Sequence, residues 1–191
     1  MANFTESYKI TRQREGGYTN DPDDTGGETY KGISRKNFPG WAGWQQVDAL
    51  KATNANKASI NDILEKNNVL QELVLNFYKK EFWDILNLDH VQHQDIANEV
   101  FDTGVNMGTY MAAVFLQKAL NVLNRNEADY ADIPVTGKIG PLTTEAINLQ
   151  KRPEEVLTIL NCLQGARYVE ICLINPKQEK FMRSWLSRVT L

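Results

Sequence analysis

The sequence contains few of the residues that build metal sites and covalent cross-links. Among its 191 residues there are two histidines, His90 and His93, and two cysteines, Cys162 and Cys172. The histidines are three residues apart in a polar stretch, and neither belongs to the HExxH motif of zinc hydrolases. We therefore expect a protein that works without a metal ion or a cofactor.

The two cysteines lie ten residues apart in a segment with a helical pattern. On one helix they would be ~15 Å apart along the axis and would point in directions roughly 80° apart. A disulfide cannot join them within that helix. We expect both to be small, buried apolar side chains.

The sequence also lacks long apolar runs and a strong excess of one charge. Its uninterrupted apolar runs are short, such as Leu73–Leu75, whereas a membrane helix needs ~20 apolar residues. We expect it not to be an integral membrane protein. The formal net charge is −3, which gives no general reason to bind nucleic acid. The N-terminal residues have no apolar core, so we expect synthesis in the cytoplasm without a signal peptide.

Most of the chain shows the pattern of amphipathic helices. Asn3 and Glu6 have the spacing of a capping box, and the helix that they begin is expected to run to about Glu15, before two glycines. Apolar residues at helical intervals predict further helices over residues 69–78, 96–106, 110–123, 142–149 and 153–174, with a last helix that carries Phe181 and Trp185. Trp41 and Trp44 are expected in a short linker.

Residues 18–34 are different, because they are dense in turn formers and offer only short pieces that could form strands. We expect a small β-hairpin or an extended loop near residues 18–35. The fold class is therefore mainly α, with one small β element.

Glu15 is the first candidate for chemistry. It stands at the predicted C-terminal end of a helix, directly before Gly16 and Gly17. The unpaired carbonyl groups at a helix C-terminus disfavour a charged carboxylate, so the pKa of Glu15 should be raised. A carboxyl group that stays protonated near neutral pH can act as a general acid. The alternative is a solvated glutamate on the surface.

A cluster of carboxylates next to this position is the second candidate. It consists of Asp21, Asp23, Asp24 and Glu28. Glycoside hydrolysis usually needs a second carboxylate opposite the first. The hydroxyl of Thr29 could hold a water or a substrate hydroxyl. Two alternatives stay open: the aspartates form turns, or they bind calcium, although the spacing of an EF-hand is missing.

Aromatic residues form the third candidate group. Tyr18 and Tyr30 flank residues 21–28, which we call the acidic segment, and we expect both tyrosines in a cleft. Trp83 and Trp185 continue apolar helix faces, and we expect them in the core.

Taken together, the motifs of residues 15–34 resemble the signature of the glycoside hydrolase family 108 lysozymes, which are phage-type N-acetylmuramidases. The similar motifs are Glu15-Gly16-Gly17-Tyr18, Asp21-Pro22, Asp24–Thr29 and Gly32-Ile33-Ser34. Further similarity lies in residues 78–84. Residues 101–108, 136–143 and 185–188 resemble the companion segment of that family, which is thought to bind peptidoglycan.

The resemblance implies a lysozyme-like helical fold and a division of labour along the chain. Residues 1–95 would form the catalytic segment and residues 96–191 the peptidoglycan-binding segment, packed together as one body. The implied reaction is hydrolysis of the β-1,4 bond between N-acetylmuramic acid and N-acetylglucosamine. Glu15 would be the general acid, assisted by Asp24 and Thr29.

The resemblance also suggests which residues bind substrate. These are Tyr18, Gly27, Tyr30 and Asn106, the last as a hydrogen-bonding partner for an N-acetyl group. For Asn106 the alternative is a helix C-cap.

The implied partner is the glycan strand of peptidoglycan, and we expect a monomer. Because peptidoglycan lies outside the inner membrane, the protein would act on the cell wall or in the periplasm after release or export, as a phage or prophage endolysin does. Two other functions remain open. One is a cell-wall binding or secretion-activator protein without catalysis. The other is a lytic transglycosylase, for which Asp24 would be dispensable.

Overall fold

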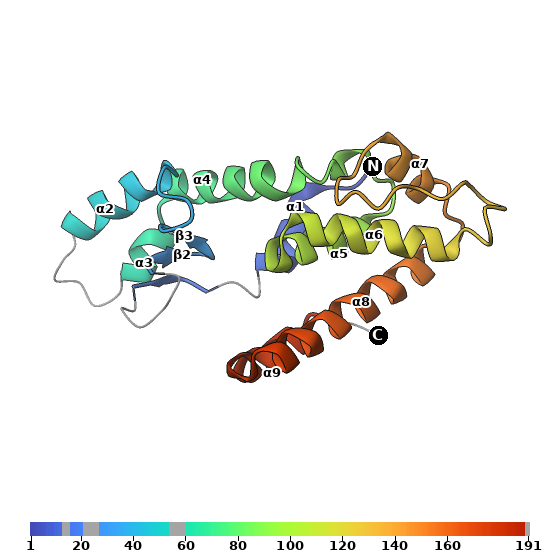
Figure 1. Ribbon diagram of the computed structural model, residues 1–191. Coiled ribbons are helices and arrows are strands. Elements are labelled where there is room, and N and C mark those ends of the chain that lie inside the picture. The colour runs from blue at the N-terminus through green and yellow to red at the C-terminus, as the bar shows by residue number, and fades with distance from the viewer. Residues whose placement is uncertain (13–15, 21–26, 54–59, 190–191) are drawn as a thin grey trace. The chain divides into compact units, whose positions relative to one another are not determined.

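The computed structural model describes residues 1–12, 16–20, 27–53 and 60–189 (Figure 1). The chain divides into two compact units. Residues 8–81 form the first, which we call the sheet unit, and residues 1–7 together with 82–191 form the second, which we call the helical unit. The predicted division near residue 95, and the packing of both segments as one body, stay predictions.

Two helices contribute to both units. Helix α1 (Phe4–Arg12) begins in the helical unit and ends in the sheet unit. The π-helix η1 (Lys79–Trp83) begins in the sheet unit and ends in the helical unit. The backbone N–H of Glu6 donates to the side chain of Asn3 at 3.2 Å, so Asn3 caps α1 as the sequence predicted.

The sheet has three short antiparallel strands in the order β1 (Tyr18–Thr19), β2 (Thr29–Tyr30) and β3 (Ile33–Ser34). Lys31 and Gly32 join β2 to β3, with φ angles of 46° and 78°. Two successive residues with positive φ are typical of a type I′ turn, whose twist matches that of paired strands. The small β element predicted near residues 18–35 is confirmed.

Three helices complete the sheet unit, α2 (Gly43–Thr53), α3 (Ile60–Glu65) and α4 (Asn68–Tyr78). Helix α2 packs on α3 and α4, and α3 packs on α4. The side chain of Asn67 accepts a hydrogen bond from the N–H of Leu70 at 2.8 Å. This cap starts a new helix and separates α4 from α3.

The linker predicted around Trp44 is wrong, because Trp44 belongs to α2. Its side chain is buried, and its indole N–H donates to the carbonyl of Phe38 at 2.9 Å. The helix buries Val47 on the same side. The eleven residues of α2 contain few buried apolar side chains, so the sequence shows no helical period here and the helix was not predicted.

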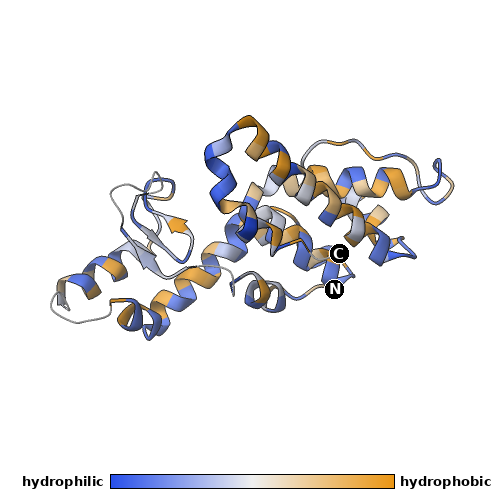
Figure 2. Ribbon diagram, turned by 90° about the horizontal axis from the view of Figure 1, so that it is seen from below, coloured by the Kyte–Doolittle hydropathy of each residue, from blue (hydrophilic) through white to orange (hydrophobic). Residues whose placement is uncertain are grey.

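The helical unit is a bundle built mainly from α5 (Gln94–Met107), α6 (Thr109–Leu123) and α8 (Pro153–Ile174), which pack against one another in pairs. Helix α7 (Pro141–Asn148) packs on α6. Figure 2 shows apolar and polar residues interleaved along these helices, as expected for elements with one buried face.

The remaining elements are short. The 3-10 helix η2 (Leu88–His90) precedes α5, and η3 (Pro176–Phe181) and α9 (Met182–Leu186) follow α8. The predicted end of the long helix at Asn175 is confirmed, as is a further helix at the C-terminus.

An aromatic cluster lies in the core of the helical unit. The rings of Phe4, Trp83 and Phe101 contact one another edge to face, with centroids 5.6 to 5.9 Å apart. Edge-to-face pairs add to the free energy gained by burying the rings. Trp83 is fully buried, so its predicted place in the core is confirmed.

Helix α8 corrects one expectation about the cysteines. Both thiols are free, and Cys172 is buried whereas Cys162 is exposed. The prediction that both are buried is therefore wrong for Cys162. Helix α8 packs on α5 and α6, and two positions about 80° apart around a helix need not both face these neighbours.

By length and composition, α8 is the one helix in the described part of the chain that is apolar enough to cross a membrane. Core helices of soluble proteins pass the same test. The expectation that the protein does not span a membrane stays a prediction.

A buried ion pair joins the C-terminal end of the helical unit to α5. The guanidinium of Arg188 donates to the carboxylate of Asp102 at 2.9 Å, and both side chains are at most 10% exposed. Removing one partner from such a pair leaves an uncompensated charge in a medium of low dielectric.

We therefore expect Arg188→Met to lower the free energy of unfolding by ~3 kcal/mol. The matched control is Arg167→Met, which removes the partner of Glu170 from an exposed pair on α8 and should cost no more than ~1 kcal/mol. Urea denaturation followed by circular dichroism measures both values. Equal losses of unfolding free energy in the two variants would contradict the expectation that the buried pair stabilises the protein more than the exposed pair.

Candidate functional site

The predicted site residues are only partly visible in the structure. Glu15 and Asp24 lie outside the described residues, whereas Tyr18, Gly27, Thr29 and Tyr30 belong to the sheet unit. The described residues around Tyr18 and Glu28 hold both ends of the acidic segment.

The sheet register brings these two ends together. Tyr18 pairs with Tyr30, and Thr19 pairs with Thr29. In addition, the carbonyl of Gly17 accepts a hydrogen bond from the N–H of Lys31 at 3.1 Å. The chain thus leaves the sheet before the acidic segment and returns to it afterwards at directly opposite positions.

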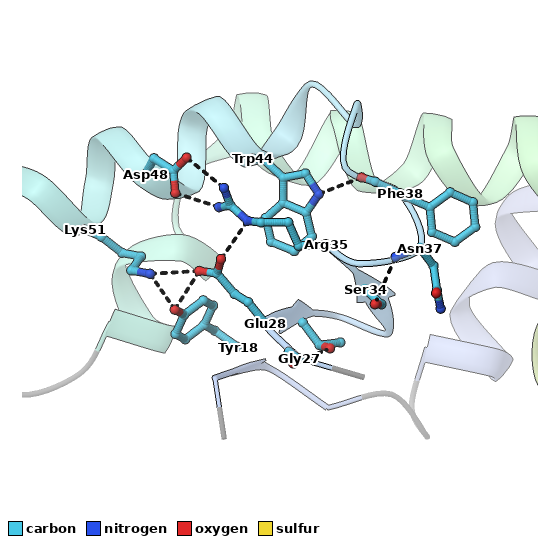
Figure 3. A network of polar contacts seen from close by, with 11 residues as sticks. Tyr18, Gly27, Glu28, Ser34, Arg35, Asn37, Phe38, Trp44, Asp48 and Lys51 are labelled. Atoms are coloured by element: carbon cyan, nitrogen blue, oxygen red, sulfur yellow. Dashed lines mark hydrogen bonds and ion pairs between the residues drawn. The ribbon is translucent and has the colours of Figure 1, made fainter. Parts of the chain in front are cut away.

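A network of charged side chains surrounds Glu28, which ends the acidic segment (Figure 3). The ammonium of Lys51, on α2, donates to Glu28 at 2.8 Å and to the hydroxyl of Tyr18 at 2.6 Å. The Tyr18 hydroxyl in turn donates to Glu28 at 2.8 Å. Arg35 forms an ion pair with the second carboxylate oxygen of Glu28 at 2.6 Å.

Arg35 links this network to a second carboxylate and to an aromatic ring. Its guanidinium donates two hydrogen bonds to Asp48, at 2.6 and 3.0 Å. It also lies over the ring of Trp44, 4.5 Å from the centroid. Such a paired and stacked guanidinium has little freedom to reorient. Through Arg35, helix α2 holds Glu28 in one place.

The network keeps Glu28 ionised. Burial alone would raise the pKa of Glu28, but the hydrogen bonds from Lys51 and Tyr18 and the charge of Arg35 outweigh it and lower the pKa. A carboxyl group with a lowered pKa is a poor proton donor near neutral pH. Glu28 therefore anchors the segment and is unsuited to the role of general acid.

Thr29 and Tyr30 have different surroundings. The hydroxyl of Thr29, which is half-buried, donates to the carbonyl of Gly27 at 3.2 Å, and its oxygen can accept a further hydrogen bond. Tyr30 is 1% exposed, and its hydroxyl accepts a hydrogen bond from Gln71 at 3.0 Å. Tyr30 thus lies in the core of the sheet unit. A contact between Tyr30 and substrate stays a prediction that would require neighbouring side chains to move.

Helix α4 holds the turn of the sheet. The hydroxyl of Tyr78 donates to the carbonyl of Lys31 at 2.6 Å, and the ammonium of Lys31 contacts Gln71 and Glu65. Lys31 is 5% exposed, so its charge is balanced within the protein. Residues from α3 and α4 therefore fix the register that brings the two ends of the acidic segment together.

Asn61 gives Gly17 a structural role. The side-chain oxygen of Asn61, on α3, accepts a hydrogen bond from the N–H of Tyr18 at 2.6 Å. A Cβ atom added to Gly17 would lie 2.5 Å from the same oxygen. A larger residue at position 17 would therefore require the Asn61 side chain to move.

Asn106, the remaining predicted site residue, belongs to the helical unit. It is half-buried on α5, and its side-chain amide donates to the hydroxyl of Tyr168 on α8. Burial raises the pKa of Tyr168 to about 12, and the ring stacks on Trp185 with centroids 5.1 Å apart. The alternative of a C-cap is wrong, because Gly108 caps the helix.

The sequence analysis did not identify three residues that hold the site, namely Lys51, Arg35 and Asn61. Lys51 lies on α2, a helix that the sequence pattern does not predict, and it contacts Glu28 through tertiary packing. No spacing in the sequence indicates such a pairing. Within the described ranges, no three histidine, cysteine, aspartate or glutamate side chains gather as a metal site requires.

Two family models match this chain, one in each half of the sequence. A family model described as Glycosyl hydrolase 108 matches residues 8–108, and one described as Predicted Peptidoglycan domain matches residues 111–190. Among solved structures, the chain is similar to "Structure of Brucella abortus SagA", with 21% identity and a TM-score of 0.58 over 97% of this chain and 88% of that one. At this identity the likeness shows the fold alone. A search of curated proteins finds no match.

We expect Gly17→Ala to displace Asn61 and to loosen the start of the sheet, because the new Cβ would overlap the Asn61 side chain. A loss of ~1 kcal/mol in the free energy of unfolding is expected, the size of one hydrogen bond, because the shift of Asn61 breaks its bond with the N–H of Tyr18. Gly16→Ala is the control, since a Cβ there meets no described atom within 4 Å. Thermal denaturation of both variants measures the difference. The explanation fails if Gly16→Ala destabilises the protein as much as Gly17→Ala.

The lowered pKa of Glu28 predicts a dependence of stability on pH. A carboxylate with a lowered pKa in the folded state stabilises fully above its ordinary pKa of 4.5. This contribution is lost as pH falls through the lowered folded-state value. Glu28→Gln should therefore destabilise the protein by ~1–3 kcal/mol at pH 7, and the difference should shrink below pH 4.5.

Urea unfolding at several pH values tests this expectation. Glu72→Gln is the control, because Glu72 is an exposed glutamate on α4 in the same unit. A constant difference between natural protein and the Glu28 variant down to pH 3 would show that the charge of Glu28 is not what stabilises the network.

Proposed function

This chain belongs to the glycosyl hydrolase 108 family, and on that premise we propose that it is a muramidase. The proposed reaction is hydrolysis of the β-1,4 bond between N-acetylmuramic acid and N-acetylglucosamine in peptidoglycan. The single observation that carries the proposal is the family match over residues 8–108, since this range contains the whole motif from Glu15 to Ser34.

Glu15 is proposed as the general acid. It would donate its proton to the glycosidic oxygen as the bond to the anomeric carbon breaks, and water would supply the hydroxyl group of the new reducing end. The lowered pKa of Glu28 supports this assignment, because it leaves the proton-donating role to a carboxyl group other than Glu28. Gly16 would leave the backbone bare for the approach of a sugar ring.

Asp24 would stabilise positive charge at the anomeric carbon or orient the attacking water, and Thr29 would assist through its hydroxyl. The separation of the two carboxyl groups decides the stereochemistry. About 5 Å corresponds to retention and roughly 6.5–9.5 Å to inversion. Tyr18, Gly27, Tyr30 and Asn106 are proposed as substrate-binding residues.

The second family match supports peptidoglycan as the partner of residues 111–190. We propose that the protein acts on the cell wall after release or export, as an endolysin of phage or prophage origin. Under this proposal it works as a monomer without a metal ion or cofactor.

The test is muropeptide analysis of purified peptidoglycan after digestion by the natural protein and by Glu15→Gln. This substitution keeps the size of the side chain and removes the acid. We expect new reducing-end muramic acid from the natural protein and a loss of at least ~100-fold in the variant, the usual range for a general acid. Glu6→Gln is the matched control, because Glu6 is an exposed glutamate on α1, and it should keep full activity.

Other products would change the conclusion. Anhydro-muramic ends would indicate a lytic transglycosylase. No products from the natural protein, together with sedimentation on cell walls, would leave a binding or secretion-activator protein. Full activity of Glu15→Gln would remove Glu15 from the mechanism.

A further inference from the structure

A pocket of about 430 Å³ lies in the helical unit, apart from the acidic segment. It is lined by the end of α6, the segment after it, and the junction of α7 and α8. All of its lining residues fall between 122 and 155, inside the range matched by the peptidoglycan domain. Its volume is typical of small-ligand sites.

The pocket carries more positive than negative charge. Arg125 donates two hydrogen bonds to Asp129, at 2.5 and 2.7 Å, and Arg152 donates one to Glu155 at 2.8 Å. Lys151 also lines the pocket and makes no hydrogen bond or ion pair with the residues that the structure describes. The hydrogen bond from Arg125, with the charges of Lys151 and Arg152, lowers the pKa of Asp129. The guanidinium groups of Arg125 and Arg152 are therefore paired with carboxylates, whereas the ammonium of Lys151 has no hydrogen-bonding partner among the described residues.

A strained turn begins at Arg125, which lines the pocket. Arg125, Asn126 and Glu127 have φ angles of 55°, 57° and 64°, which are unfavourable for residues with a Cβ. The buried side chain of Asn124 holds this turn, because it accepts from the N–H of Glu127 at 3.2 Å and donates to Asp132 at 2.6 Å. Strained backbone that the surrounding structure holds in place is found most often at ligand sites.

The two sides of the pocket are tied together at Tyr130. Its hydroxyl accepts a hydrogen bond from Gln150 at 2.5 Å and donates to the carbonyl of Leu120 at 2.8 Å. The apolar lining includes Val122 and Leu149, which are 70% and 51% exposed. The pocket therefore combines fixed polar walls with apolar edges.

We propose that this pocket binds a carboxylate of the peptide stem of peptidoglycan, with Lys151 as its principal partner. The inference rests on peptidoglycan as the substrate in the proposed function. In peptidoglycan the lactyl carboxyl of muramic acid is amidated by the stem, so the free carboxylates belong to the peptide. A neutral N-acetyl sugar makes no use of the excess positive charge, whereas a peptide uses both the charge and the apolar edges that suit alanine methyl groups.

Binding of a soluble stem tests the proposal. The probe is the free pentapeptide L-alanyl-γ-D-glutamyl-diaminopimelyl-D-alanyl-D-alanine, and the readout is isothermal titration calorimetry with the full chain. Lys151→Met should weaken binding about tenfold, the loss expected for one charge-assisted hydrogen bond. Lys118→Met, which removes an exposed lysine of α6 in the same unit, should bind as the natural protein does.

Two further ligands identify the chemistry. The same peptide with its carboxyl groups amidated should bind at least about tenfold more weakly, and neutral oligosaccharides of N-acetylglucosamine should not compete for the pocket. Equal affinity for the amidated peptide, unchanged affinity in Lys151→Met, or competition by the neutral oligosaccharide would each overturn the proposal.

The failure of this inference can be told apart from the failure of the proposed function. Release of reducing ends by a protein that does not bind the peptide would refute the pocket and leave the muramidase. Peptide binding that depends on Lys151, without any hydrolysis, would refute the muramidase and leave the pocket.

Discussion

The acidic segment of this protein depends on the pairing of charges around Glu28. A half-buried carboxylate is costly unless opposite charges and hydrogen-bond donors surround it, and Lys51, Arg35 and Tyr18 supply them. Because Lys51 lies on α2 and Arg35 follows β3 directly, the network joins helix, sheet and acidic segment in one arrangement. The segment can therefore carry several carboxylates without its ends moving apart.

This pairing also separates the carboxylates of the segment by role. A carboxylate held by two cations stays ionised and positions the chain, whereas a general acid must keep its proton near neutral pH. In glycosidases the two catalytic groups differ in this way because their surroundings differ. The acid role then falls to a carboxyl group outside the network, for which we propose Glu15.

The helical unit follows another principle. Its bundle is stabilised by buried apolar faces, by the aromatic cluster of Phe4, Trp83 and Phe101, and by the buried pair of Asp102 with Arg188. Its surface ion pairs join residues three or four positions apart, such as Arg125 with Asp129 and Arg152 with Glu155. Lys151, which lines the pocket, forms no such pair with the described residues. The pocket lies in the range matched by the peptidoglycan domain, and the acidic segment lies in the range matched by the glycosyl hydrolase 108 family.

The sequence by itself determined the features that depend on neighbouring residues. The cap at Asn3, the hairpin near residues 18–35 and the span of α8 follow from signals within a few residues or from one helical period. The partners of Glu28, the burial of Tyr30 and the exposure of Cys162 do not. Lys51 is 23 residues from Glu28, and only tertiary packing decides which distant side chains meet and which face of a helix is covered, because burial and charge pairing depend on contacts that no local pattern encodes.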